Sequence, residues 1–81
     1  MNIELSKQAV KTLSNLDLKR KTQIIDAIKN IPKGDVKPLK GCKNYYRLRV
    51  GDWRIVFCYK NNDVLLIAKI APRGDVYKGG L

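Results

Sequence analysis

The stretch from residue 45 to residue 59 is the part of this chain that most narrows its possible folds. In it, Gly51-Asp52 separates two segments in which every second residue is apolar. A two-residue turn with Gly in the first position is typical of a type II′ β-hairpin. Counting outward from the turn therefore sets the register of the two strands. The predicted pairs are Val50 with Trp53, Arg49 with Arg54, Leu48 with Ile55, Arg47 with Val56, and Tyr46 with Phe57.

This register gives the hairpin two different faces. The apolar face consists of Tyr46, Leu48, Val50, Trp53, Ile55 and Phe57. The other face carries Arg47, Arg49 and Arg54, with Arg49 directly opposite Arg54. A like-charge pair at opposed positions mildly destabilises a sheet. Two interpretations follow from the pattern: a solvated outer face, which antiparallel sheets commonly have, or a binding site for an anion.

Charge is distributed unevenly along the chain. The net charge is +10, from 17 Lys and Arg against 7 Asp and Glu. Residues 1–36 contribute seven basic and four acidic side chains, whereas residues 37–81 contribute ten basic and three acidic ones. Such a field attracts polyanions, chiefly nucleic acid, and can equally recruit an acidic protein. Charge alone does not choose between these partners.

The length of the chain, 81 residues, indicates a single domain over 1–81 with a modest core. No apolar run approaches the roughly 20 residues of a membrane span, and the first residues lack the layout of a secretory signal. We therefore expect a soluble, cytoplasmic protein without membrane contact. Cys42 and Cys58 are expected to be reduced, partly buried thiols. Because the chain has no His, the usual zinc sites are improbable, and we expect neither a metal nor a cofactor.

Apolar periodicity predicts a short strand over 2–5 and two helices before the hairpin. Ser6 is a suitable N-cap for the first helix and Asp17 for the second. Pro32 and Gly34 are expected to end the second helix. Each helix has an apolar stripe that we expect to face the core rather than a partner. The stripes are Ala9, Val10, Leu13 and Leu16 in the first helix, and Ile24, Ile25, Ile28 and Ile31 in the second.

The remaining segments complete the predicted architecture. Residues 32–44 are basic and contain Pro and Gly, which predicts a long connection. Residues 64–70 are apolar on both faces, which predicts a central strand. If Asn61-Asn62 is the loop before that strand, Lys69 lies opposite Arg54. The basic row across three strands is then Arg49, Arg54 and Lys69.

The order of elements is strand, helix, helix and three further strands, which indicates an α+β fold. We expect the N-terminal strand and the helical hairpin to pack on one face of an antiparallel-rich, four-stranded sheet. The basic face of the sheet is then expected to remain open.

Three motifs in combination resemble a known family. They are Leu39-Lys40-Gly41, the pattern Tyr-Arg-Leu-Arg-x-Gly-Asp-Trp-Arg over 46–54, and Arg73-Gly74-Asp75-Val76-Tyr77. Together they resemble the RelE/ParE superfamily of toxins from type II toxin–antitoxin systems, and the resemblance covers essentially the whole chain. It implies a RelE-like fold. For the RelE branch it implies an mRNA endonuclease that works in the ribosomal A site, whereas the ParE branch poisons DNA gyrase with the same fold.

The resemblance also implies site residues and partners. The implied catalytic residues are Arg73, Tyr77 and Arg54, and the implied contacts to RNA phosphates are Arg47 and Arg49. We add Lys40 and Lys69 as expected phosphate contacts. The retention of Arg73 with Tyr77 favours the ribonuclease over the gyrase poison. The implied partners are a cognate acidic antitoxin, the ribosome and mRNA, with DNA contacted only through the antitoxin.

The available side chains limit the chemistry of such a site. Metal-free RNA cleavage needs a base, an acid and cations for the phosphate oxygens. Arginine stays protonated, so the arginines can serve only as an electrostatic clamp. Tyr77 has a reference pKa of about 10, and nearby guanidinium groups favour its phenolate, so it is a candidate general base; alternatively it stacks on an RNA base. Some relatives carry lysines in place of Arg47 and Arg49, which leaves Lys40 and Lys69 as further candidates for proton transfer.

Three functions therefore remain in view: a ribosome-dependent endoribonuclease, a toxin that inhibits gyrase, and a non-catalytic basic module that binds RNA or protein. The gyrase inhibitor would be indifferent to Tyr77→Phe. The basic module would bind with salt-dependent affinity and without turnover.

Overall fold

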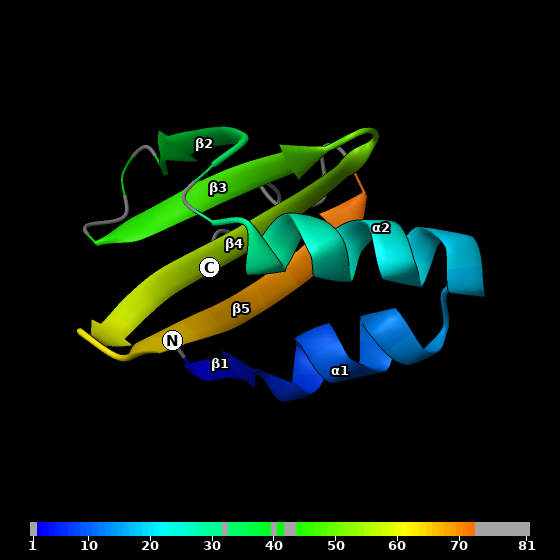
Figure 1. The fold of residues 1–81 in the computed structure, drawn as a ribbon, viewed down its shortest axis with the longest axis horizontal. Helices are drawn as coiled ribbons and strands as arrows, with labels where there is room; N and C mark the ends of the chain where they lie inside the picture. The colour runs from blue at the N-terminus through cyan, green and yellow to red at the C-terminus, as the bar shows by residue number, and fades with distance from the viewer. Residues whose placement is uncertain (1, 32, 40, 42–43, 73–81) are drawn as a thin grey trace.

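The computed structural model describes residues 2–31, 33–39, 41 and 44–72. Its two layers are a sheet and a pair of helices that cover one face of that sheet (Figure 1). The elements in chain order are β1 (Asn2–Leu5), α1 (Lys7–Ser14), α2 (Leu18–Lys29), β2 (Asp35–Pro38), β3 (Tyr45–Val50), β4 (Trp53–Asn61) and β5 (Val64–Pro72). The strand order is β1-β5-β4-β3-β2. β1 runs parallel to β5, and the other three pairs are antiparallel, so the predicted α+β fold is confirmed.

Both helices begin at the predicted N-caps. The Ser6 hydroxyl accepts a hydrogen bond from the Ala9 N–H at 3.1 Å, and the Asp17 carboxylate accepts one from the Arg20 N–H at 3.0 Å. These bonds satisfy N–H groups that have no partner within the helix. The Ser6 hydroxyl also donates to the carbonyl of Ala68 in β5 at 2.6 Å. One side chain therefore both starts α1 and ties it to the sheet.

We expect Ser6→Ala to lower the free energy of unfolding by about 1–2 kcal/mol, because it removes the cap of α1 and leaves the Ala68 carbonyl without this donor. Ser14→Ala is the matched control, since the exposed Ser14 hydroxyl donates to the Val10 and Lys11 carbonyls of its own helix. Urea unfolding of both variants measures the difference. Equal transition midpoints would contradict the double role of Ser6.

The central hairpin has the predicted register. All five predicted pairs are present, from Val50 with Trp53 to Tyr46 with Phe57. Gly51 has a φ of 59°, as the first central position of a type II′ turn requires, and glycine adopts this conformation without steric cost.

The core lies between the helices and the apolar face of the sheet. Val10, which was predicted to be in the core, lies outside it, because its side chain is 50% exposed. Ala9 and Leu13 are buried where α1 packs on the sheet, and Val10 lies about 100° around the helix from Ala9. The buried residues of the main cluster are Ala9, Leu13, Ile24, Ile28, Leu48, Ile55, Phe57, Leu65, Ile67 and Ile70.

The sheet has five strands rather than the predicted four. Part of the predicted connection, residues 35–38, forms β2 and pairs with the edge of β3 (Figure 1). Four residues with two charges and a Pro give little local indication of a strand. Pro38 is tolerated because β2 is an edge strand. The strand therefore depends on pairing with β3, which the local sequence does not reveal.

Candidate functional site

The face of the sheet that lies away from the helices carries two cross-strand rows of side chains. The first row, from β2 to β5, is Asp35, Arg49, Arg54 and Ala71. The second row is Lys37, Arg47, Val56 and Lys69. The rows are two residues apart along β3, which corresponds to roughly 7 Å. The three arginines of the hairpin therefore share one face, as the sequence predicts.

Lys69 lies in the second row, so the predicted row of Arg49, Arg54 and Lys69 is wrong. Lys69 pairs with Val56, and the residue opposite Arg54 is Ala71. The four cations of the hairpin and β5 still share a face, but Lys69 is a diagonal neighbour of Arg54.

The position of the β4–β5 loop causes this difference. The loop is one residue further along than predicted, because Asn61 still pairs with Val64. The Asn61 side chain accepts a hydrogen bond from the Asp63 N–H at 2.8 Å, which stabilises the turn. The ladder also shifts register twice, between Val56 and Phe57 and between Tyr59 and Asn61, but the two shifts cancel before Lys69 pairs with Val56. Such bulges cannot be obtained by counting residues from a turn.

The basic face is partly buried, which corrects the expectation that it is open. Val56 has no exposed surface, and Ala71 and Leu39 are 4% and 8% exposed. These three residues form a second apolar cluster, against which Tyr45 and Ala68 pack. Apolar side chains thus occupy positions of the basic face beside the cations.

The cations of this face differ in exposure. The Arg47 side chain is only 13% exposed, and its Nη1 atom is 3.7 Å from Asp35 Oδ2, which is too far for a hydrogen bond. Within the described part of the chain, no acceptor hydrogen-bonds to this buried atom. Arg49 is exposed, and Arg54 and Lys69 are half-buried. A buried guanidinium N–H without an acceptor is costly, and an anion oxygen would relieve that cost.

Several predicted positions lie outside the described residues. They are the implied site residues Lys40, Arg73 and Tyr77, together with Cys42. Their predicted roles therefore stay predictions. Cys58 is a buried free thiol.

Two further searches of the described residues bear on the site. In residues 2–31, 33–39, 41 and 44–72, no group of three His, Cys, Asp or Glu could hold a metal ion. Neither of the two helices in this part of the chain is long and apolar enough to cross a membrane.

Sequence reasoning missed two residues of the basic face, Asp35 and Lys37. Both are on β2, where they lie opposite Arg49 and Arg47. The alternation Asp35-Val36-Lys37 is a period-2 signal, but three residues are too few to distinguish a strand from a loop.

Comparison with known proteins gives the chain its family. The family model for the ParE toxin of the type II toxin–antitoxin system parDE matches residues 3–77. The chain belongs to the RelE/ParE superfamily of type II toxins. Among curated members, the putative toxin RelE1 of Methanocaldococcus jannaschii is 34% identical over 85 residues, which cover 95% of this chain and 94% of the relative.

Solved structures of the superfamily have the same fold. The toxin in the RelB-RelE antitoxin-toxin complex from Methanococcus jannaschii has a TM-score of 0.74 and 28% identity, over 93% of this chain and 95% of that one. The archaeal RelE-RelB complex from Pyrococcus horikoshii OT3 gives a TM-score of 0.71 and 30% identity, over 91% and 96% of the two chains. The RelE-like fold predicted from the motifs is thus confirmed.

Proposed function

We propose that this toxin is a ribosome-dependent mRNA endoribonuclease that cleaves in the A site. The observation that carries the proposal is the sheet face on which Arg47, Arg49 and Arg54 gather, with Arg49 directly opposite Arg54. Opposed guanidinium groups repel one another, and a bound phosphate offsets that repulsion while accepting bidentate hydrogen bonds. The similarity to proteins named RelE supports RNA as the source of that phosphate.

The proposed reaction is a metal-free transesterification. The 2′-oxygen attacks the adjacent phosphorus and the bond to the 5′-oxygen breaks, which leaves a 2′,3′-cyclic phosphate and a 5′-hydroxyl. In this proposal Tyr77 accepts the 2′ proton, and Arg54 and Arg73 stabilise the charge that develops on the phosphate oxygens. Arginine stays protonated at neutral pH, so it does not transfer a proton. Lys40 and Lys69 are therefore the candidates for protonating the leaving 5′-oxygen.

The cations other than Arg54 and Arg73 are also assigned to substrate binding. Arg47 and Arg49 hold RNA phosphates in this proposal, together with Lys40 and Lys69. Phosphate contacts fix the register of an RNA strand without reading its bases. Selection of the cleavage position is then left to the ribosome, which holds the mRNA.

We also propose that a cognate acidic antitoxin neutralises the toxin. The two archaeal RelE structures are complexes with RelB antitoxins. A net charge of +10 favours an acidic partner. We further propose that the toxin contacts DNA only through the antitoxin, and that the toxin is located in the cytoplasm.

Primer extension on mRNA programmed into 70S ribosomes tests the ribonuclease proposal. We expect cuts within the A-site codon when the toxin is added, and no cuts on the same mRNA without ribosomes. Absence of cleavage under both conditions would overturn the proposal.

The match to a ParE toxin model favours a second candidate, inhibition of DNA gyrase. A gyrase supercoiling assay separates the two activities. Inhibited supercoiling without mRNA cuts would assign the toxin to the ParE branch.

A further inference from the structure

β2 extends the basic face by one strand that none of the three family motifs includes. Antiparallel pairing with β3 places Lys37 opposite Arg47 and Asp35 opposite Arg49. Lys37 and Arg49 are therefore diagonal neighbours on adjacent strands. Diagonal neighbours are roughly 7–8 Å apart, within reach of one another's long side chains.

Exposure distinguishes Lys37 from most cations of the face. Lys37 and Arg49 are exposed, whereas Arg47, Arg54 and Lys69 are half-buried or less exposed. An incoming strand therefore meets Lys37 and Arg49 before the deeper arginines. A lysine ammonium at such a position acts as a mobile point charge with three donors, which suits a phosphate whose exact place varies.

The charge balance of the two rows also favours a polyanion at this edge. Lys37 directly opposes Arg47, which is a second like-charge pair on the same face. Asp35 is the sole carboxylate in the two rows, and it lies near Arg47 rather than between Lys37 and Arg49. Against this one carboxylate the two rows hold five cations, which are Lys37, Arg47, Arg49, Arg54 and Lys69.

We propose that Lys37 binds a backbone phosphate of the RNA strand and that Arg49 binds the neighbouring one, so that β2 forms one wall of the RNA path. This inference rests on the proposed ribonuclease function and adds a binding residue to it. The contact is made to phosphate and is therefore independent of base identity.

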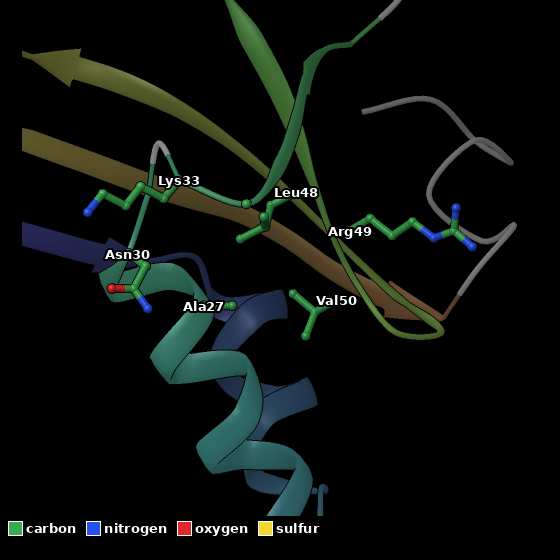
Figure 2. Close-up of a pocket in the computed structure, with 7 residues that line it drawn as sticks. Ala27, Asn30, Lys33, Leu48, Arg49 and Val50 are labelled. Carbon is green, nitrogen blue, oxygen red and sulfur yellow. The ribbon is translucent and has the colours of Figure 1, made fainter.

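Lys33 provides a matched control for Lys37. It is the same residue type, is exposed, and lies four positions earlier. Lys33 lies at a groove of about 460 Å³ that is also lined by Ala27 and Asn30 and, from β3, by Arg49. Figure 2 shows its side chain directed away from that of Arg49, toward the other side of β3. Removing either lysine charge changes the net charge equally. Any difference in RNA binding between the two variants therefore reflects where the lysine lies.

The test is the salt dependence of binding to a fluorescent, 2′-O-methylated single-stranded RNA, measured by anisotropy between about 50 mM and about 200 mM salt. Lys37→Gln is expected to weaken binding several-fold at the lowest salt and to reduce the magnitude of the log–log slope by about 0.7, the value for one phosphate contact on a single strand. Lys33→Gln is expected to leave the slope unchanged. Lys37→Arg should restore the wild-type slope because it keeps the charge.

Two outcomes would overturn the inference in distinguishable ways. If Lys37→Gln matches Lys33→Gln while Arg49→Gln reduces the slope, Lys37 makes no contact and the proposed function stands. If the wild-type toxin shows no salt-dependent binding at all, the RNA-binding face itself is wrong, and the proposed function falls with the inference. Circular dichroism of each variant verifies that the fold is retained.

Discussion

Tyr77→Phe is expected to lower the rate of A-site mRNA cleavage by at least about 100-fold. A positioned general base contributes roughly 10²–10⁴-fold to a proton-transfer step, and this substitution removes only the phenolic oxygen that would accept the 2′ proton. The aromatic ring remains, so stacking on an RNA base is retained. The measurement is a single-turnover time course of primer-extension products on programmed 70S ribosomes, with toxin in excess.

The matched control is Tyr59→Phe, which removes the same atom from a tyrosine on β4 that packs against Phe57. It is expected to cleave at the wild-type rate. Equal rates for wild type and Tyr77→Phe would show that the phenol is not the base, and would leave stacking as its role. Loss of cleavage with Tyr59→Phe as well would point instead to damage of the fold.

The features that could be predicted from the sequence are those with a local physical cause. The Gly51-Asp52 turn sets the hairpin register because its backbone conformation fixes which residues oppose each other. Ser6 and Asp17 were predictable as caps because their short polar side chains satisfy nearby N–H groups. The shared face of the three arginines follows from the same register and strand alternation.

The features that could not be predicted depend on contacts between distant segments. β2 forms because its backbone pairs with the edge of β3. A segment of four residues is too short for its own sequence to predict a strand. The position of Lys69 depends on where the β4–β5 loop lies, because Asn61 still pairs with Val64. The burial of Val56 depends on the cluster that it forms with Leu39 and Ala71. Each of these features could be found only from the three-dimensional structure. Together they replace the predicted open row with a partly buried face that has an additional strand.

Phe57→Ala is expected to cause the largest loss of stability among single core substitutions, about 3–5 kcal/mol. Phe57 has no exposed surface and is the largest fully buried side chain among the described residues. It stacks on Tyr46 at a centroid distance of 5.6 Å. A domain of this size has only about 5–15 kcal/mol of stability in total. Thermal unfolding followed by circular dichroism should therefore show the midpoint falling by about 15 °C or more.

Two further substitutions separate burial from ring contacts in this prediction. Tyr59→Ala removes an aromatic neighbour of Phe57 that is 40% exposed, so its midpoint should fall much less. Phe57→Leu keeps most of the buried volume and is expected to cost less than about 1.5 kcal/mol. A midpoint for Phe57→Ala close to that of Tyr59→Ala would contradict the central place of Phe57. Because β4 carries Phe57 on the helix side and Arg54 on the other face, the proposed RNA cleavage by Phe57→Ala should be lost at temperatures above its lowered midpoint and retained below it.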